Sequence, residues 1–328
     1  MALAAPVATV PNLVVFGNSL SDNGNDVTLA ASLGVSTDGI GYWHGRFTNS
    51  YVWNEYTAKI LGLTLANKAY GGATTNNGPS PGSAFNMTIP SFHDQTVAWL
   101  AANPAPGQFH LEHDVIEVEI GGNDILNHAM ELFAGTLSPA QLAAQVATSI
   151  ASDVEALAAA GYRNINVWNL PAAELSPLIR SLGASAIIKP LLDMVNAAIA
   201  QSVGAVATKY NIQGAAHIRV IDLYGFILAT LQPSVLAAIG VTDTTDACYV
   251  KDAAGNASIC NNPDQHFFYD DNHPASRMHY LWGAAAAALI RNPETQLTPD
   301  FIVGLAAKYN IAQSDAQTNI IVCGTKCH

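Results

Sequence analysis

The sequence predicts an α/β protein in which helices cover both faces of a mainly parallel β-sheet. Short apolar runs rich in β-branched residues alternate along the chain with longer segments of helical periodicity. Strands and helices that alternate in this way form parallel sheets covered by helices. Half of the 328 residues are hydrophobic and only 12% are charged, against roughly 25% in an average domain, so a large core can be buried.

Four segments have the pattern of buried strands. Pro11 and Gly17 bound the first, Gly121 ends the second and Pro171 ends the third, because proline and glycine interrupt a strand. In chain order the predicted strands are Leu13–Phe16, Val115–Ile120, Ile165–Leu170 and Ile218–Leu223.

Four longer segments have the pattern of helices. Asn49 or Ser50 can cap the first, and Gly161 ends the second, which is rich in alanine. In chain order the predicted helices are Asn49–Leu61, Ser138–Ala160, Pro190–Tyr210 and Ser276–Ile290.

We expect one domain over residues 1–328, because the chain has no internal repeat and no low-complexity linker. The stretch 238–267 is long, polar and contains two cysteines. We therefore expect it to be an ordered surface excursion that a disulfide holds together.

The charge of the chain excludes some partners. Thirteen Lys and Arg stand against twenty-five Asp and Glu, a formal net charge of −12, and no basic stripe interrupts the acidic surface. Such a surface repels nucleic acids and anionic membranes. No apolar run approaches the ~18 residues of a membrane helix, so we expect no membrane-spanning segment.

The cysteines favour an oxidising compartment. They are Cys248, Cys260, Cys323 and Cys327, and neither local pair has the C-x-x-C spacing of a zinc or redox site. The simplest of three connectivities joins the members of each local pair. Sequons at Asn86 and Asn256 suit the same compartment. The first eleven residues are too short and too weakly apolar for a signal peptide, so we expect them to begin a mature chain. We predict a secreted, extracellular protein.

Ser19 follows the first predicted strand, in the run Gly-Asn-Ser-Leu-Ser-Asp. Ligands of parallel sheets bind at the carboxyl ends of the strands. A serine on a turn from strand to helix can expose its hydroxyl and direct backbone N–H groups at an oxyanion. The alternative role of Ser19 is to cap the following helix.

Two glycine-rich turns are expected at the same edge of the sheet. Asn123 lies in Gly-Gly-Asn-Asp after the second strand and presents an amide donor, and Gly72 lies in a run that begins at Asn67. By itself each run is an ordinary turn sequence.

Asp270 and His273 lie on a turn before the last predicted helix. At this spacing the carboxylate can fix the tautomer of the imidazole, whose other nitrogen can take a proton from a serine. A metal site of Asp270, Asp271, His273 and His279 is the alternative, but the spacing matches no ligand motif.

Together these blocks resemble those of the GDSL, or SGNH, hydrolases. The blocks are Gly-Asn-Ser-Leu at 17–20, Gly72 in an Asn-x-x-x-x-Gly context, Gly-x-Asn-Asp at 121–124 and Asp-x-x-His at 270–273. They occur in the family's order and span nearly the whole chain. Gly-Arg-Phe-Thr-Asn at 45–49 and Asn-Leu-Pro at 169–171 also resemble the larger, lipase-like branch of the family.

The resemblance implies a flavodoxin-like three-layer α/β/α sandwich, the SGNH hydrolase fold, and ester hydrolysis with no cofactor and no metal. It implies Ser19 as the nucleophile, His273 as general base and then acid, and Asp270 as the carboxylate that orients it. The implied oxyanion hole consists of the backbone N–H groups of Ser19 and Gly72 and the side-chain amide of Asn123.

Two positions bear on these implied roles. Asp270 is preferred to the adjacent Asp271 because it has the motif's three-residue spacing from the histidine. Asn18 departs from the family, which usually has Asp there. Asparagine keeps a carbonyl acceptor but loses the charge, so we expect a change in turn geometry more than a loss of activity.

The sequence indicates the class of substrate less directly than it indicates the reaction. We expect a small-molecule, lipid or glycan ester as the partner, and the oligomeric state stays open. A carbohydrate acetylesterase or an acyltransferase would use the same site. A different class, a catalytically inactive secreted binding or effector protein on the same scaffold, is supported by Asn18 alone.

Other side chains near the predicted site have two interpretations. Aromatic residues precede and enter the first helix and either line a pocket or pack in the core, and core packing is favoured. They are Tyr42, Trp43, Phe47 and Trp53. Glu117 and Glu119 place two carboxylates on one face of a buried strand, where we expect hydrogen bonds to neighbouring turns.

Overall fold

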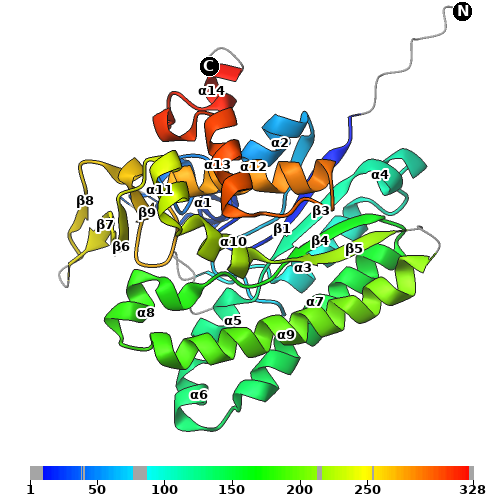
Figure 1. Ribbon diagram of the computed structural model, residues 1–328. Coiled ribbons are helices and arrows are strands. Elements are labelled where there is room, and N and C mark those ends of the chain that lie inside the picture. Colours follow the sequence, from blue (N-terminus) through cyan, green and yellow to red (C-terminus); the bar gives the residue numbers. More distant parts are fainter. Residues whose placement is uncertain are drawn as a thin grey trace, which may run out of the picture.

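The computed structural model (Figure 1) describes residues 10–37, 39, 41–76, 87–212, 216–252 and 255–324. Its centre is a five-stranded parallel sheet of order β2-β1-β3-β4-β5, the order of flavodoxin-like sheets. The strands are β1 (Asn12–Gly17), β2 (Thr64–Asn67), β3 (Val115–Glu119), β4 (Asn164–Trp168) and β5 (His217–Ile221). The predicted parallel α/β fold is confirmed.

Helices form a layer on each face of this sheet, as Figure 1 shows. Val14 and Phe16 of β1 face one core with α3 (Phe92–Ala102), α7 (Pro139–Ala159) and α9 (Ser185–Tyr210). Leu13 and Val15 face the other, with α2 (Trp53–Leu61), α12 (Ser276–Arg291) and α13 (Pro299–Lys308). The alternation of side chains along a strand thus fills both cores, which is why these strands are continuous apolar runs.

Shorter helices occupy the loops around the sheet. They are α1 (Asn25–Ser32), α4 (Gln108–His113), α5 (Gly122–Asn127), α6 (Ala129–Ala134), α8 (Pro177–Ser181), α10 (Leu223–Thr230), α11 (Pro233–Ile239) and α14 (Ile320–Cys323). Of these, α5, α6 and α8 lie with the N-terminal part of α9 at the carboxyl edge of the sheet, on the lower left in Figure 1.

Local sequence signals account for both ends of α7. Ser138 and Gln141 cap α7 reciprocally, and Gly161 adopts a left-handed conformation just beyond its end.

In α12, Gly283 is required because a Cβ there would lie 2.5 Å from the carbonyl oxygen of Trp53. The absence of a side chain lets α12 pack directly on α2.

Two predicted helix starts are wrong. The predicted cap Asn49 lies in a loop, and α2 begins at Trp53, where Glu55 accepts a hydrogen bond from the N–H of Val52. Conversely, α9 begins five residues before Pro190, which lies inside the helix. Pro190 is the sixth residue of the helix and removes one intrahelical hydrogen bond, and the packing of α9 along α7 keeps the helix continuous through it.

The four predicted strands are confirmed, with ends shifted by up to two residues. β2 is a further strand, of which the sequence indicates only the glycine-rich turn that follows it. It is four residues long and pairs with β1 alone, so no long apolar run marks it.

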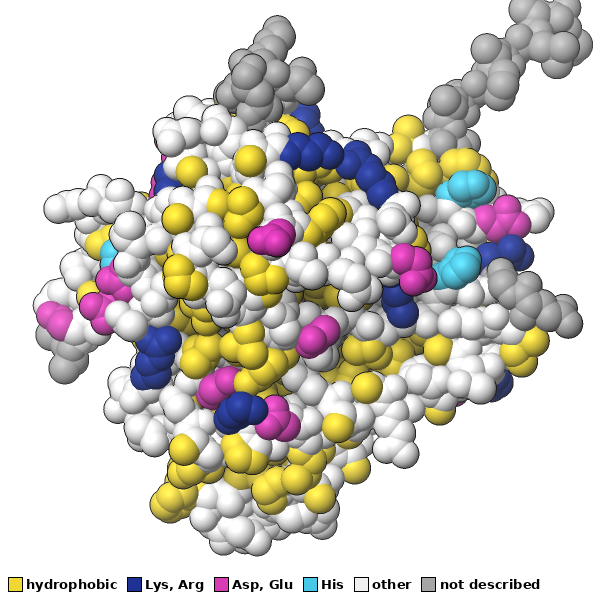
Figure 2. Space-filling view, in the orientation of Figure 1, with side chains coloured by type: hydrophobic (Ala, Val, Ile, Leu, Met, Phe, Trp, Pro, Cys, Tyr) yellow, Lys and Arg dark blue, Asp and Glu magenta, His cyan; other side chains and the backbone are white. Residues whose placement is uncertain are grey.

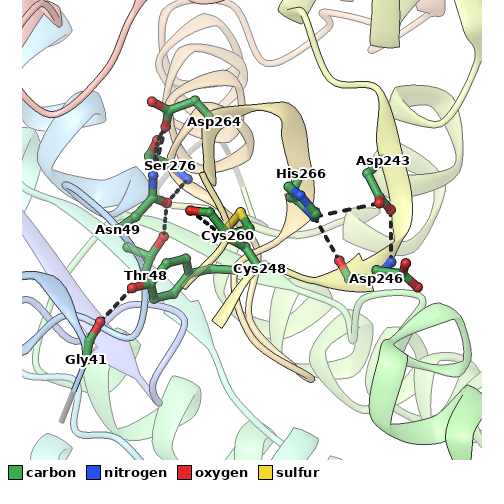
Figure 3. Close-up of a disulfide and its surroundings, with 11 residues drawn as sticks. Gly41, Thr48, Asn49, Asp243, Asp246, Cys248, Cys260, Asp264, His266 and Ser276 are labelled. Carbon is green, nitrogen blue, oxygen red and sulfur yellow. Dashed lines mark hydrogen bonds and ion pairs between the residues drawn. A yellow bond between two sulfur atoms is a disulfide. The ribbon is translucent and has the colours of Figure 1, made fainter. Parts of the chain in front are cut away.

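The stretch 238–267 contains two small sheets beside the main one. β6 (Asp243–Ala247) pairs with β9 (His266–Phe268), and β7 (Tyr249–Lys251) pairs with β8 (Ala257–Ile259). A disulfide joins Cys248 to Cys260, as Figure 3 shows and as the simplest connectivity predicts. Cys327, the sequon at Asn86 and the start of the chain lie outside the described residues.

One helix qualifies the expectation about membranes. α9 has 26 residues and is apolar enough, by length and composition alone, to cross a bilayer. In the structure it packs along α7 and β5, and Leu192, Val195 and Ile199 are in the core. A helix that covers a sheet passes the same test, so α9 is weak evidence for a membrane span.

Candidate active site

Three side chains from distant parts of the chain meet at the carboxyl edge of the sheet. Ser19 lies two residues beyond β1, and Asn123 lies in the first turn of α5, which follows β3. Between β1 and β3 the strand order changes direction, and such switch points form crevices. His273 reaches this crevice from the loop before α12. The three residues line a cavity of about 260 Å³.

Ser19, His273 and Asp270 form a chain of hydrogen bonds. The Nε2 atom of His273 lies 2.7 Å from the Oγ atom of Ser19, and its Nδ1 atom lies 2.7 Å from the Oδ2 atom of Asp270. In the tautomer that carries its proton on Nδ1, the imidazole donates to the carboxylate and accepts from the hydroxyl. A serine held in this way can lose its proton to the imidazole as it attacks a carbonyl carbon.

The carboxylate of Asp270 is held by several donors. Its Oδ1 atom accepts from the backbone N–H groups of Asn272 at 2.8 Å and His273 at 2.6 Å. Its Oδ2 atom accepts from the hydroxyl of Tyr42 at 2.7 Å, besides the imidazole. Asp271 makes no such contact and instead offers its backbone carbonyl to Leu178. The structure therefore brings Asp270, and not its neighbour, to the imidazole.

The pKa values of this pair move in opposite directions. Burial alone would raise the pKa of Asp270, but the charge of His273 and the hydrogen bonds of His273 and Tyr42 hold it below its usual value. Burial alone would lower the pKa of His273, but the charge and hydrogen bond of Asp270 raise it above its usual value. The imidazolium that forms when the histidine takes a proton is thus stabilised.

Asn18 connects the serine turn to a buried carboxylate. Its side-chain oxygen accepts from the N–H of Leu20 at 2.9 Å, which stabilises the turn that holds Ser19. Its side chain also hydrogen-bonds to Glu119, which is buried at the end of β3. Burial raises the pKa of Glu119 to about 7, against the opposing effects of Asn18 and of the His273 charge. An aspartate at position 18 would place a second carboxylate against Glu119, which accounts physically for the asparagine.

Gly72 and Asn123 lie beside Ser19 on the cavity wall. Gly72 has a φ of +79°, a conformation that glycine adopts without strain, in the turn after β2. The amide nitrogen of Asn123 donates to the carbonyl of Ala73 at 2.8 Å. An amide NH₂ group has two N–H donors, so this bond orients the side chain while a second donor remains.

Beyond these polar groups the cavity is apolar. Its walls come from α5, α8, α9 and the loop after β4, and they include Ile125, Leu126, Leu170, Ile179, Ile188 and Leu192. A smaller cavity of about 80 Å³ shares Leu20, Pro171, Ala173 and Asn272 with the first. Sequence reasoning missed the walls from α8 and α9, because their apolar residues have the same spacing as core residues.

The loop that contains residues 45–49 is fixed to the histidine loop. The amide of Asn49 donates to Asp264 at 2.8 Å, and its oxygen accepts from the N–H of Ser276 at 2.9 Å. The hydroxyl of Ser276 donates to Asp264 at 2.6 Å, beside the disulfide in Figure 3. The hydroxyl of Thr48 donates to the carbonyl of Pro274, the residue after His273. The stretch 238–267 therefore supports the loop that positions the imidazole.

The predicted aromatic cluster divides between core and site. Trp53 is fully buried and stacks on Trp282 at 4.6 Å, as the packing interpretation predicts. Trp43 contacts Arg46 instead. Phe47 does line the cavity, with its ring centre 5.2 Å from that of His273. Tyr42 contributes its hydroxyl to Asp270, a role that spacing did not reveal.

The remaining polar candidates have structural partners. His279 is buried with a pKa of about 3, first because of burial, and its Nδ1 atom faces the N–H of Trp53. The described part of the chain contains no cluster of three metal-binding side chains. Glu117 accepts hydrogen bonds from Asn166 and Trp168 of the adjacent β4, so the prediction of hydrogen bonds to neighbouring turns is wrong for this residue.

The chain is similar to known proteins over most of its length. Residues 13–286 match the sequence model of a family described as GDSL-like lipase/acylhydrolase. The chain is 24% identical to GDSL esterase/lipase 6 of Arabidopsis thaliana, over 86% of this chain and 88% of that protein. It is 24% identical to the secreted effector protein SseJ of Salmonella typhimurium, over 86% of this chain and 64% of that protein.

Among solved structures, the chain is similar to a catalytic variant of Axe2, an acetylxylan esterase of Geobacillus stearothermophilus. The sequence identity is 14% and the TM-score is 0.43, over 88% of this chain and 95% of that one.

Proposed function

The chain belongs to the family of GDSL-like lipases and acylhydrolases, and on that premise we propose that it cleaves carboxylic esters through an acyl-enzyme formed on Ser19. Membership of this family makes it a carboxylic ester hydrolase. The observation that carries the proposed mechanism is the chain of two 2.7 Å hydrogen bonds from Ser19 through His273 to Asp270.

In the first half of the reaction the Oγ atom of Ser19 attacks the ester carbonyl carbon, and Nε2 of His273 takes the hydroxyl proton. This avoids the formation of a free alkoxide. Asp270 keeps the imidazole in the required tautomer and stabilises its charge. When the tetrahedral intermediate collapses, the C–O bond to the alcohol breaks, and the imidazolium gives its proton to the departing oxygen.

In the second half water takes the place of the alcohol. His273 removes a proton from the water as it attacks the acyl carbon, and then returns a proton to Ser19 as the carboxylic acid leaves. The negative charge of both intermediates is stabilised by the backbone N–H groups of Ser19 and Gly72 and by the amide of Asn123. If an alcohol replaced water in this half, the product would be a new ester, so the same groups also support acyl transfer.

The cavity supports an acyl chain longer than acetyl. Its walls beyond Ser19 are formed by Leu126, Leu170, Ile188 and other aliphatic side chains, which bind hydrocarbon by removing it from water. A sugar would need several polar partners there. We therefore favour a lipase or acyl esterase over a carbohydrate acetylesterase.

We also propose that the protein is secreted. The Cys248–Cys260 disulfide and the exposed sequon at Asn256 support this, since disulfides persist in oxidising compartments. Protein from the culture medium of the native host, examined for a glycan on Asn256, would test this proposal.

The test of the substrate class is a series of p-nitrophenyl esters from acetate to palmitate, with Ser19→Ala as the control. We expect kcat/KM to rise from acetate to a medium-length chain and activity to disappear in the variant. A steep fall beyond acetate would favour the acetylesterase instead. Equal inactivity of both proteins on every ester would favour the non-catalytic binding protein.

A further inference from the structure

Four large hydrophobic side chains are unusually exposed to solvent. Phe133 is 89% exposed, Met130 77%, Ile187 73% and Leu182 68%, which are the highest values for large hydrophobic residues in the described part of the chain. Single exposed apolar residues are common on protein surfaces, but several together usually mark a contact surface. We call these four residues the apolar rim.

The apolar rim lies on or directly beside segments that line the cavity. Met130 and Phe133 are on α6, directly after α5, whose Leu126 both lines the cavity and is 42% exposed. Ile187 is next to Ile188, a cavity wall residue at the start of α9. Leu182 follows α8, which contributes Ile179 to the same cavity. Figure 2 shows hydrophobic side chains gathered on the lower left of the molecule, where Figure 1 places α6 and the start of α9.

Charged side chains beside the apolar rim include the exposed Glu131, which lies between Met130 and Phe133 on α6. Lys189 and Asp193 form an exposed ion pair at 2.8 Å, one turn apart on α9. Among the residues that the structure describes, no basic cluster accompanies the rim that could attract anionic headgroups, and the net charge of the whole chain is −12. The surface thus suits a partner that is apolar and carries no net negative charge.

We propose that the apolar rim docks on the surface of an aggregate of neutral or zwitterionic ester lipid and so places acyl chains at the cavity mouth. This inference rests on the proposed esterase function and extends it from dissolved to aggregated substrates. The continuity of the rim with the aliphatic cavity wall favours a lipid surface over a second copy of the chain. A second copy seated there would cover the opening through which the substrate enters.

The chain offers a matched pair of positions for the test. Ile187 lies at the start of α9, and Ile212, which is 61% exposed, lies just beyond its other end. At 1.5 Å per residue the two are roughly 37 Å apart. Ile187→Gln combined with Phe133→Gln, the rim variant, removes half of the apolar rim. Ile187→Gln alone is matched with Ile212→Gln, which removes one isoleucine of similar exposure elsewhere. Thermal unfolding of each variant confirms that it is folded.

Two measurements on the full chain test whether the apolar rim docks on a lipid surface. Binding to phosphatidylcholine vesicles is measured by flotation, and hydrolysis is measured on tributyrin above its solubility limit and on dissolved p-nitrophenyl acetate. We expect the rim variant to lose at least ~10-fold in vesicle binding and in tributyrin hydrolysis, because two apolar side chains no longer enter the lipid. Its hydrolysis of p-nitrophenyl acetate should stay within twofold of wild type, and Ile212→Gln should match wild type throughout.

Other outcomes overturn the proposal. It is wrong if wild type does not float with phosphatidylcholine, or if the rim variant and Ile212→Gln both bind the vesicles as wild type does. A dimer of the wild type that the rim variant alone abolishes, without vesicle binding, assigns the surface to a second copy of the chain. Failure of the esterase proposal is recognised separately, since a protein that floats but hydrolyses neither ester retains the docking surface and lacks the activity.

Discussion

The substitution Tyr42→Phe removes one hydrogen bond from Asp270 while it keeps the ring in place. The hydroxyl donates at 2.7 Å to Oδ2, the same oxygen that accepts from His273. The ring of Tyr42 lies 5.1 Å from that of Phe47 and 5.4 Å from that of Tyr249, contacts that phenylalanine retains. The variant therefore isolates the effect of the hydroxyl on the carboxylate.

The size of the effect follows from the charge of the acceptor. A hydrogen bond to a charged group contributes about 1.5–3 kcal/mol, equivalent to about 10- to 150-fold in rate if all of it is lost in the transition state. Asp270 keeps two backbone donors and His273, so we expect the lower end, a fall of ~10-fold in kcat/KM for a p-nitrophenyl ester. With one donor fewer, the carboxylate attracts the imidazolium more strongly and raises the pKa of His273. The acid limb of the pH profile of kcat/KM then moves to higher pH.

Tyr249→Phe is the matched control. Tyr249 belongs to the same buried cluster, but its hydroxyl has no hydrogen-bond partner among the described residues. We expect this variant to change kcat/KM by less than about twofold and to leave the acid limb where it is. If Tyr42→Phe behaved like Tyr249→Phe in both respects, the hydroxyl would have no part in holding Asp270, and our reasoning about this carboxylate would be refuted.

Three further variants test other parts of the site and the core. Asn123→Ala should lower kcat by ~10²–10³-fold with little change in KM, and an unchanged kcat would remove Asn123 from the oxyanion hole. Glu119→Gln removes a charge that raises the pKa of His273, so the acid limb of kcat/KM should move to lower pH, opposite to Tyr42→Phe; no movement would mean that Glu119 does not act on the imidazole. Asp26 is fully buried in the first turn of α1. Burial and the charge of Asp22 raise its pKa to about 8, above its value in the unfolded chain. Folding therefore takes up a proton, and the stability of wild type falls as the pH rises from about 4 to 8. The free energy of unfolding of Asp26→Asn, measured in urea, should therefore rise relative to that of wild type by up to ~1.4 kcal/mol for each pH unit. If the difference between the two free energies stayed constant from pH 5 to 8, this account of Asp26 would be contradicted.

The fold and the central residues of the site could be predicted from the sequence because their signals are local. Each long strand is a continuous apolar run, and Ser19 and Asn123 each follow such a run directly. Asp270 and His273 are three residues apart, so one turn is enough to bring them together. Only the topology was needed to bring the three segments to one edge of the sheet.

The features that the sequence did not reveal depend on distant contacts. The hydroxyl of Tyr42 reaches a carboxylate 228 residues away, and no local pattern records that pairing. A hydrogen bond from Glu119 to a neighbouring turn could be expected from the sequence, but its partner Asn18, about 100 residues away along the chain, could not. The cavity walls from α8 and α9 have ordinary apolar spacing, which periodicity assigns to the core. The start of α9 was missed because a proline is a strong stop signal and tertiary packing outweighed it.

Covalent labelling of Ser19 tests the central claim most directly. The wild-type chain and Ser19→Ala would be treated with a fluorophosphonate, digested and examined by mass spectrometry, with ester hydrolysis followed in parallel. We predict one adduct on Ser19 that forms as hydrolysis is lost, and neither adduct nor hydrolysis in the variant. An adduct on another residue, or ester hydrolysis that persists in Ser19→Ala, would contradict the assignment of Ser19 as the nucleophile.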